Sequence, residues 1–220
     1  MDSAKLMNAL AAEALPVRRL RPPLIRMLIW LVLTSLWVGF IVAFMGVRPD
    51  IAEKAMEVRW SFEQGATLMT GLMAAVAAFC AVVPGRSRWE QYLPLIPAGA
   101  WLGALVFGSY EAWLASGDLL AQITPDWDCF PGIVIAGFGP AVLMVLMLRR
   151  GAPVAPRVSI MLGALAATAV ADFGLRLFHP QDASIMVLVW QVGSVFLLSA
   201  AAGMSGRKFL SWAERSPLED

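Results

Sequence analysis

Residues 27–46 read MLIWLVLTSLWVGFIVAFMG, twenty consecutive residues without a charged side chain. A helix needs about 20 mostly apolar residues to cross the hydrocarbon core of a bilayer, so this stretch predicts a membrane-spanning helix. Five further stretches of this kind follow, at residues 65–84, 92–110, 131–148, 158–178 and 184–204. The sequence therefore predicts an all-α polytopic membrane protein, a bundle of six transmembrane helices.

The composition of the whole chain agrees with this prediction. Of its 220 residues, 59% are hydrophobic and 15% are charged, against about 45–50% and about 25% in soluble globular proteins. These values exclude a disordered chain, a disulfide-rich secreted module and a basic nucleic-acid-binding domain. The first apolar stretch is too long for the hydrophobic region of a cleavable signal peptide, and no small-residue cleavage site follows it. We therefore expect that stretch to remain as a span.

Lys and Arg residues are distributed unequally between the two sides of the predicted bundle. Thirteen of them fall in the N-terminal arm, the second and fourth loops and the C-terminal tail, and four fall on the other side. Because Lys and Arg resist translocation, the richer side is expected to be cytoplasmic. The predicted organisation is a cytoplasmic arm at residues 1–26, a transmembrane domain at residues 27–204 and a cytoplasmic tail at residues 205–220.

The N-terminal arm has the pattern of a short amphipathic helix. Leu6, Leu10 and Ala14 recur every four residues, with Met7 and Ala11 beside them, so one face of the predicted helix is apolar. A helix of about a dozen residues is not stable alone in water. The apolar face therefore needs a partner surface or the bilayer.

A basic segment follows this helix. It contains Arg18, Arg19 and Arg21 and ends in two prolines. Two interpretations of the arm remain open. The arginines and the apolar face can contact lipid headgroups at the cytoplasmic surface of the membrane. Alternatively, the helix docks in a groove of a cytoplasmic partner protein.

Asp172 and Arg176 are the acid and the base that lie well inside a predicted span. They are four residues apart and so lie on one helical face, where they can form an ion pair. Charges within a membrane mark functional sites by default and should face the bundle interior. We expect this intramembrane ion pair to be a structural clamp; the alternative is the polar gate of a small six-span transporter or channel.

Cys129 and His179 fall on the side of the predicted bundle opposite to the termini, together with Asp128 and Asp182. Such side chains can coordinate a borderline-soft cation such as zinc, although their spacing is not that of a tight metal site. The simpler interpretation places His179 at the membrane interface and makes Asp182 the N-cap of the sixth helix. Cys80 is expected near the cytoplasmic end of the second span, where it is buried and too far from Cys129 for a disulfide.

Catalysis has little support in the sequence. The chain has one histidine, which is the commonest general acid or base near neutral pH. Ser109 and Ser194 each follow a glycine, as an intramembrane protease could require, but Gly-Ser pairs are common where membrane helices pack. We therefore expect neither an enzyme nor a cofactor.

Five short segments are distinctive: LMNALAAEALPVRRLRPP at residues 6–23, MGVRPD at 45–50, PGRSRW at 84–89, WDCF at 127–130, and LRLFHP at 175–180 with the following Asp182. Together, in order and at matching spacing, they resemble the six-span bacterial family named for the negative regulator of sigma F (NrsF-type). The resemblance extends from about residue 6 to residue 212.

The resemblance implies an anti-sigma factor of the bacterial inner membrane that takes part in transcription regulation. Such a protein holds an extracytoplasmic-function sigma factor inactive and releases it in an envelope or metal-related stress response. Its partners would be that sigma factor and the lipid bilayer, without direct contact to nucleic acid. The resemblance also implies that residues 3–21 bind the sigma factor and that Cys129 takes part in sensing. Where many family members have a second cysteine, this chain has His179, which leaves either a Cys/His metal site or no thiol sensing.

Overall fold

The computed structural model describes residues 3–13, 20–118, 129–152, 154–180 and 182–210. These residues are helical or connect helices, and no strand occurs among them. In chain order the elements are α1 (Ser3–Glu13), α2 (Pro23–Met45), α3 (Ile51–Met56), α4 (Val58–Ala81), η1 (Arg88–Tyr92), α5 (Leu95–Ser116), α6 (Cys129–Leu148), α7 (Pro156–Leu175), α8 (Ser184–Met186), η3 (Val187–Val192), α9 (Gly193–Met204) and α10 (Gly206–Phe209). The prediction of an all-α fold is confirmed.

Six segments are long and apolar enough to cross a membrane, and each overlaps one of the six predicted stretches. They cover residues 23–45, 58–81, 88–116, 130–148, 156–175 and 184–204. The first begins at Pro23, earlier than residue 27, and the second begins at Val58, earlier than residue 65. Charged residues conceal the start of the second helix from a hydropathy analysis, because Arg59 and Glu63 lie in its first turns. Much of the expected loop at residues 47–64 is therefore helical.

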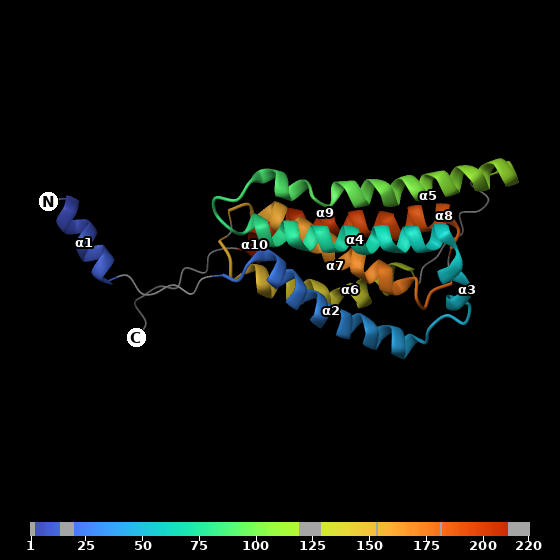
Figure 1. The fold of residues 1–220 in the computed structure, drawn as a ribbon, viewed down its shortest axis with the longest axis horizontal. Helices are drawn as coiled ribbons and strands as arrows, with labels where there is room; N and C mark the ends of the chain where they lie inside the picture. Colours follow the sequence, from blue (N-terminus) through green and yellow to red (C-terminus); the bar gives the residue numbers. More distant parts are fainter. Residues whose placement is uncertain (1–2, 14–19, 119–128, 153, 181, 211–220) are drawn as a thin grey trace.

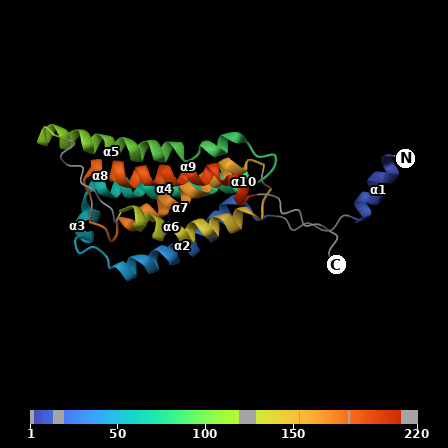
Figure 2. The ribbon, with the colours of Figure 1, turned by 180° about the vertical axis from the view of Figure 1, so that it is seen from behind.

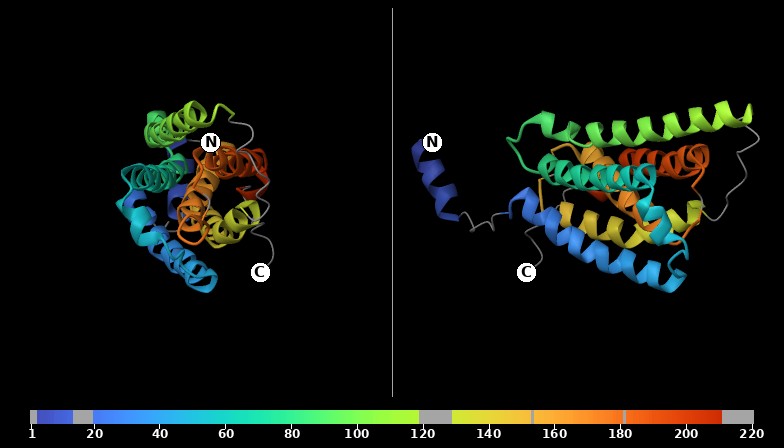
Figure 3. Two further views of the ribbon diagram at one scale, coloured as in Figure 1. Left: turned by 90° about the vertical axis from the view of Figure 1, so that its right-hand side faces the viewer. Right: turned by 45° about the vertical axis from the view of Figure 1, so that its right-hand side comes forward.

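Helix α7 is the central element of the bundle. It packs against α4, α6 and α9, while α5 lies on the outside against α4 and α8 (Figures 1 and 3). Helix α2 begins and α10 ends at the same end of the bundle, which is termed the terminal end here (Figure 2). The opposite end, with α3 and the start of α8, is termed the distal end.

Small residues bring α4 and α7 close together. A Cβ atom added at Gly71 on α4 would lie 2.9 Å from Val170 Cγ2 and 3.3 Å from the carbonyl oxygen of Ala166 on α7. Between membrane helices such small residues permit close backbone approach and tight van der Waals packing. Further alanines of the two helices are fully buried: Ala74, Ala75, Ala77, Ala78, Ala166, Ala167, Ala169 and Ala171.

Two polar side chains attach α2 to α6. The buried indole Nε1 of Trp30 donates a hydrogen bond of 3.0 Å to the carbonyl oxygen of Pro140, inside α6. Arg26 lies 4.5 Å above the ring of Phe79, and its Nη2 donates to the carbonyl oxygen of Met147 at 2.6 Å. The last carbonyls of a helix have no partner within the helix, so Arg26 satisfies one at the end of α6.

Candidate functional site

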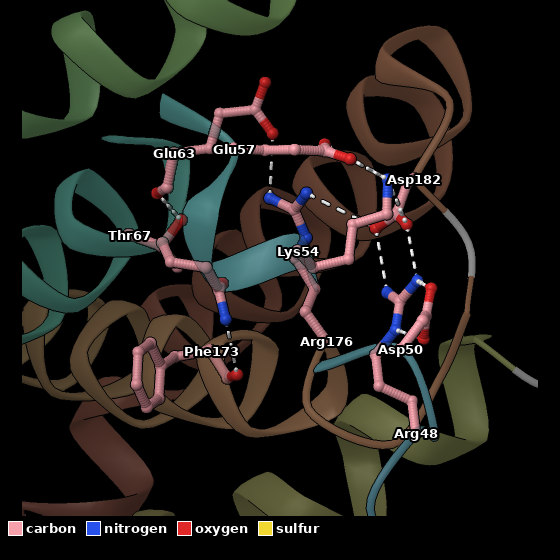
Figure 4. A network of polar contacts seen from close by, with 10 residues as sticks. Arg48, Asp50, Lys54, Glu57, Glu63, Thr67, Phe173, Arg176 and Asp182 are labelled. Carbon is pink, nitrogen blue, oxygen red and sulfur yellow. Dashed lines mark hydrogen bonds and ion pairs between the residues drawn. The ribbon is translucent and has the colours of Figure 1, made fainter. Parts of the chain in front are cut away.

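A cluster of charged side chains occupies the distal end of the bundle, and Figure 4 shows it from close by. Its members come from the α2–α3 connection, from α3 and the residue that follows it, from the first turns of α4, and from the segment between α7 and α8. We term it the distal cluster, defined by Arg48, Asp50, Lys54, Glu57, Glu63, Arg176 and Asp182.

Arg48 connects two distant parts of the chain in this cluster. Its Nε and Nη2 donate to the two oxygens of Asp50 at 2.7 Å each, and its Nη1 and Nη2 donate to the two oxygens of Asp182 at 3.0 and 2.6 Å. Its backbone N–H also donates to the carbonyl oxygen of Leu177, at 3.0 Å. The side chain is buried, and only the planar, forked guanidinium group can bind two carboxylates in this way. Arg48 thus fastens the segment after α2 to the segment after α7.

Asp182 is the carboxylate on which the cations of the cluster converge. Besides Arg48, the Nζ of Lys54 lies 3.4 Å from its Oδ2, and the Nη2 of Arg176 lies 3.8 Å from its Oδ1. Burial disfavours the ionised form of Asp182, but the hydrogen bonds and charge of Arg48, aided by the other two cations, outweigh this and lower its pKa. Hydrogen bonds from Arg48 likewise lower the pKa of Asp50 to about 2. Both carboxylates are therefore ionised at neutral pH.

Arg176 forms a buried ion pair with α4. Its Nη1 donates to Oε2 of Glu63 at 2.9 Å, the two side chains are only 1% and 2% exposed, and its guanidinium lies 5.8 Å from the ring centre of Trp60. The predicted Asp172–Arg176 ion pair is therefore wrong. Asp172 is completely buried, and neither of its carboxylate oxygens has a hydrogen-bond partner in the part of the chain that the structure describes. Arg176 follows the end of α7 and binds across to α4, and its partner Glu63 lies within the expected loop.

The capping role predicted for Asp182 is also wrong. The residue that precedes α8 is Ala183, and no side chain among the described residues caps that helix end. Asp182 instead binds Arg48, which competes for the same oxygens that a cap would need.

The remaining residues predicted for sensing are only partly described. Asp128 lies outside the described residues, and so does the side chain of Cys129, which is the first residue of α6. His179 is half-buried after α7, and its backbone N–H donates to the carbonyl oxygen of Leu175 at 2.8 Å. Among the described side chains no group of three or more His, Cys, Asp or Glu could hold a metal ion. A zinc site at Cys129 and His179 thus stays a prediction.

Cys80 is buried near the end of α4, with 3% of its surface exposed, as the sequence predicts. It lies toward the terminal end of the bundle, whereas α6 begins with Cys129 toward the distal end. This placement agrees with the expectation that the two cysteines do not form a disulfide with each other.

The arm begins with the predicted helix, α1. Leu6 and Met7 on it are 42% and 64% exposed, and Arg21 beyond it is exposed as well. Ala14, Arg18, Arg19 and the side chain of Leu10 lie outside the described residues. The described part of α1 therefore presents apolar side chains that the bundle does not cover.

Basic residues dominate the terminal end. Arg86 and Glu90 form an ion pair there, with Nε of Arg86 2.7 Å from Oε2 of Glu90. The described part of this end, without the arm helix α1, has one acidic residue, Glu90. It has nine basic residues: Arg21, Arg26, Arg86, Arg88, Arg149, Arg150, Arg157, Arg207 and Lys208. The unequal charge of the two sides predicted from the sequence is thus a feature of the folded bundle.

The fold and the charge distribution define a helical bundle with six helices apolar enough to cross a membrane, a basic end, a cluster of ion pairs at the other end and a short amphipathic arm. The family model described as "Negative regulator of sigma F" (NrsF) matches residues 10–212, nearly the whole chain. The chain belongs to this family, whose name designates negative regulators of a sigma factor. Searches of curated proteins and of solved structures found no match.

The distal cluster predicts a particular dependence of stability on pH. Because the folded protein lowers the pKa of Asp182, its contribution to stability is complete above its unfolded pKa of about 3.9 and is lost as pH falls below that value. We expect Asp182→Asn to lower the melting temperature of the purified protein by a constant amount between about pH 8 and pH 5, because the carboxylate is fully ionised throughout that range.

Below about pH 4 this difference between wild type and variant should shrink, because the Asp182 carboxylate of the unfolded wild-type chain takes up a proton while the folded chain resists protonation. Asp118→Asn is a suitable control, since Asp118 is exposed and lies outside the distal cluster. A difference that already vanishes between about pH 7 and pH 5 would show that Arg48 does not hold Asp182 ionised.

Proposed function

We propose that the protein is a membrane-bound anti-sigma factor that sequesters an extracytoplasmic-function sigma factor and releases it under envelope or metal-type stress. The observation that carries the proposal is the family match over residues 10–212. In this proposal the protein acts by binding and not as an enzyme. The rival proposal of a small transporter or channel relied on an Asp172–Arg176 gate, and Arg176 pairs with Glu63 instead.

The proposed location is the bacterial inner membrane, with both termini in the cytoplasm. Six helices of sufficient length and apolarity support the location. The excess of Lys and Arg at the terminal end supports the orientation, because basic loops are retained on the cytoplasmic side. This orientation places α1 in the compartment where sigma factors bind RNA polymerase.

The proposed contact is made by the arm, residues 3–21. The exposed Leu6 and Met7 provide an apolar face of the kind that amphipathic helices insert into hydrophobic grooves. With 11 residues, α1 is too short to be stable alone, so binding and full ordering of the helix would be coupled. A marginal helix suits a switch, because a coupling free energy of about 1–3 kcal/mol changes its occupancy several-fold or more.

The proposed signal enters at the distal end. Cys129 starts α6 and His179 follows α7, so a thiol-reactive compound or a metal ion there would act on the packing of α6 against α7. Helix α7 also contacts α10 at the terminal end, which gives a continuous path through the bundle toward the side from which the arm extends. Asp128 and Asp182 are the acidic neighbours in sequence that could assist a bound cation.

A charge on the apolar face of the arm should abolish sequestration. Burial of a leucine contributes about 1.5–3 kcal/mol, so Leu6→Glu is expected to weaken sigma-factor binding by at least tenfold. The matched control is Asn8→Glu, which adds the same charge on the opposite side of α1. Co-purification of the sigma factor and a sigma-dependent reporter gene measure the effect.

Deletion of residues 2–21 should give the same loss of repression while the bundle still inserts. A transporter would keep its flux after this deletion. If the deletion variant or Leu6→Glu still represses as strongly as wild type, the arm is not the binding element.

Replacement of Cys129 should weaken the response to thiol-reactive metals. We expect Cys129→Ser to reduce induction of the same reporter by such metals, because the proposed sensing thiol is lost. Cys80→Ser is the control, since Cys80 is buried at the other end of the bundle and should leave induction unchanged. Equal induction of the two variants would remove Cys129 from the proposed sensing site.

A further inference from the structure

Acceptor oxygens without a donor gather where α4 and α7 meet near the distal end. The structure's described residues offer no hydrogen-bond partner to Oε1 of Glu63, Oε1 of Gln64 or either carboxylate oxygen of Asp172. All three side chains are at least 97% buried. Nε2 of Gln64 donates to the carbonyl oxygen of Phe173 at 3.3 Å. Phe173 is the residue that follows Asp172 in α7, so this hydrogen bond brings Gln64 to the same turn of the helix. Two donors of this region, Nε of Arg176 and Nε1 of Trp60, also have no hydrogen-bond partner among the described residues, and neither of them bonds to Asp172.

The charges of the same region do not balance if Asp172 is ionised. Asp172 is attracted electrostatically by the positive charge of Arg176 and repelled by the negative charge of Glu63. The guanidinium of Arg176 is engaged by Glu63 at 2.9 Å and by Asp182 at 3.8 Å. Arg59 on α4 also acts on Glu63, but its side chain is exposed and pairs with Glu111. Arg176 is therefore the buried cation that Glu63 and Asp172 share.

The other elements packed against α7 offer no compensation. Helices α6, α8, η3 and α9 contain no Asp, Glu, Lys, Arg or His. The basic residues of α2 and α10, Arg26, Arg207 and Lys208, belong to the terminal end of the bundle. An ionised carboxylate that is buried without a partner is strongly disfavoured, and such a group takes up a proton instead.

We propose that Asp172 is a proton-binding site: at neutral pH it is a neutral carboxylic acid, and its O–H donates to one of the acceptor oxygens at the α4–α7 contact. One bound proton removes the uncompensated charge and provides a hydrogen-bond donor at the same time. A proton suits the site better than a metal ion, because the described residues bring no third acidic or imidazole ligand to Glu63 and Asp172. Apolar surroundings keep carboxylic acids neutral in this way in other proteins.

The bound proton would couple the packing of α4 and α7 to pH. Its loss in alkaline solution places a second negative charge beside Glu63, within the closely packed contact between the two helices. The site is separate from the arm, so its test does not depend on the proposed sigma-factor contact.

Infrared spectroscopy of the full-length protein in lipid nanodiscs tests the proposal. At about pH 7 the exposed carboxyl groups are ionised, so the C=O stretch of a protonated carboxylic acid reports a buried group. We expect this band in the wild-type protein, with a downshift in deuterium oxide and loss in alkaline buffer. It should be absent from Asp172→Asn and retained in the matched variant Glu63→Gln.

The absence of the band from the wild-type spectrum would overturn the proposal, and this measurement does not require any variant to fold. Loss of the band in Glu63→Gln with retention in Asp172→Asn would assign the proton to Glu63 and also overturn it. Thermal unfolding in sodium chloride and in choline chloride at equal concentration provides a second measurement. We expect equal melting temperatures; stabilisation by sodium would identify a cation site instead.

Discussion

A buried charge needs a partner, and the ion pair between Arg176 and Glu63 satisfies this requirement at the point where α7 ends beside α4. Removing one partner of a buried ion pair typically costs about 3–5 kcal/mol, because the other charge is left uncompensated. Arg176 also reaches Asp182, and Asp182 is held by Arg48, so the segments after α2 and after α7 depend on the same chain of contacts. Because Arg176 binds Glu63, the buried carboxylate of Asp172 is left without a hydrogen-bond partner among the described residues.

Helix α7 relates this distal network to the rest of the molecule. It packs against α4, α6 and α9 along its length and against α10 at the terminal end. A change in packing at the distal end can therefore reach the terminal end through the contacts of α7. The close approach of α4 and α7 at Gly71 makes their contact intolerant of small displacements, as tightly packed interfaces are. These features support the proposal that a distal signal controls a binding element at the other end.

The six long apolar helices could be predicted from the sequence because hydropathy is a local property. The first helix is apparent from residues 27–46 alone, and the structure adds only its first turn from Pro23. Charge pairing is different, because it depends on residues far apart in the chain. Arg48 and Asp182 are separated by 134 positions, and Arg176 and Glu63 by 113. No local pattern identifies either pair.

The two wrong predictions for the site have the same physical origin. A spacing of four residues favours the pairing of Asp172 with Arg176, and the position of Asp182 before a helix favours capping. In both cases an ionic partner from another helix or loop replaces the local interaction. The sequence gives no sign of Glu63 as a partner, because it precedes the apolar stretch at residues 65–84, whereas α4 begins at Val58.

Site-directed thiol labelling determines whether the chain crosses the membrane with its arm in the cytoplasm and α3 on the opposite side. In a background with Cys80→Ser and Cys129→Ser, single cysteines would replace Ser3 in α1 and the exposed Ala52 in α3. With a membrane-impermeant reagent, we expect labelling of the cysteine at position 52 in cells whose inner membrane is intact, and labelling at position 3 only after lysis. Labelling at position 3 in intact cells would overturn the proposed orientation and function, because the arm could not then reach a sigma factor.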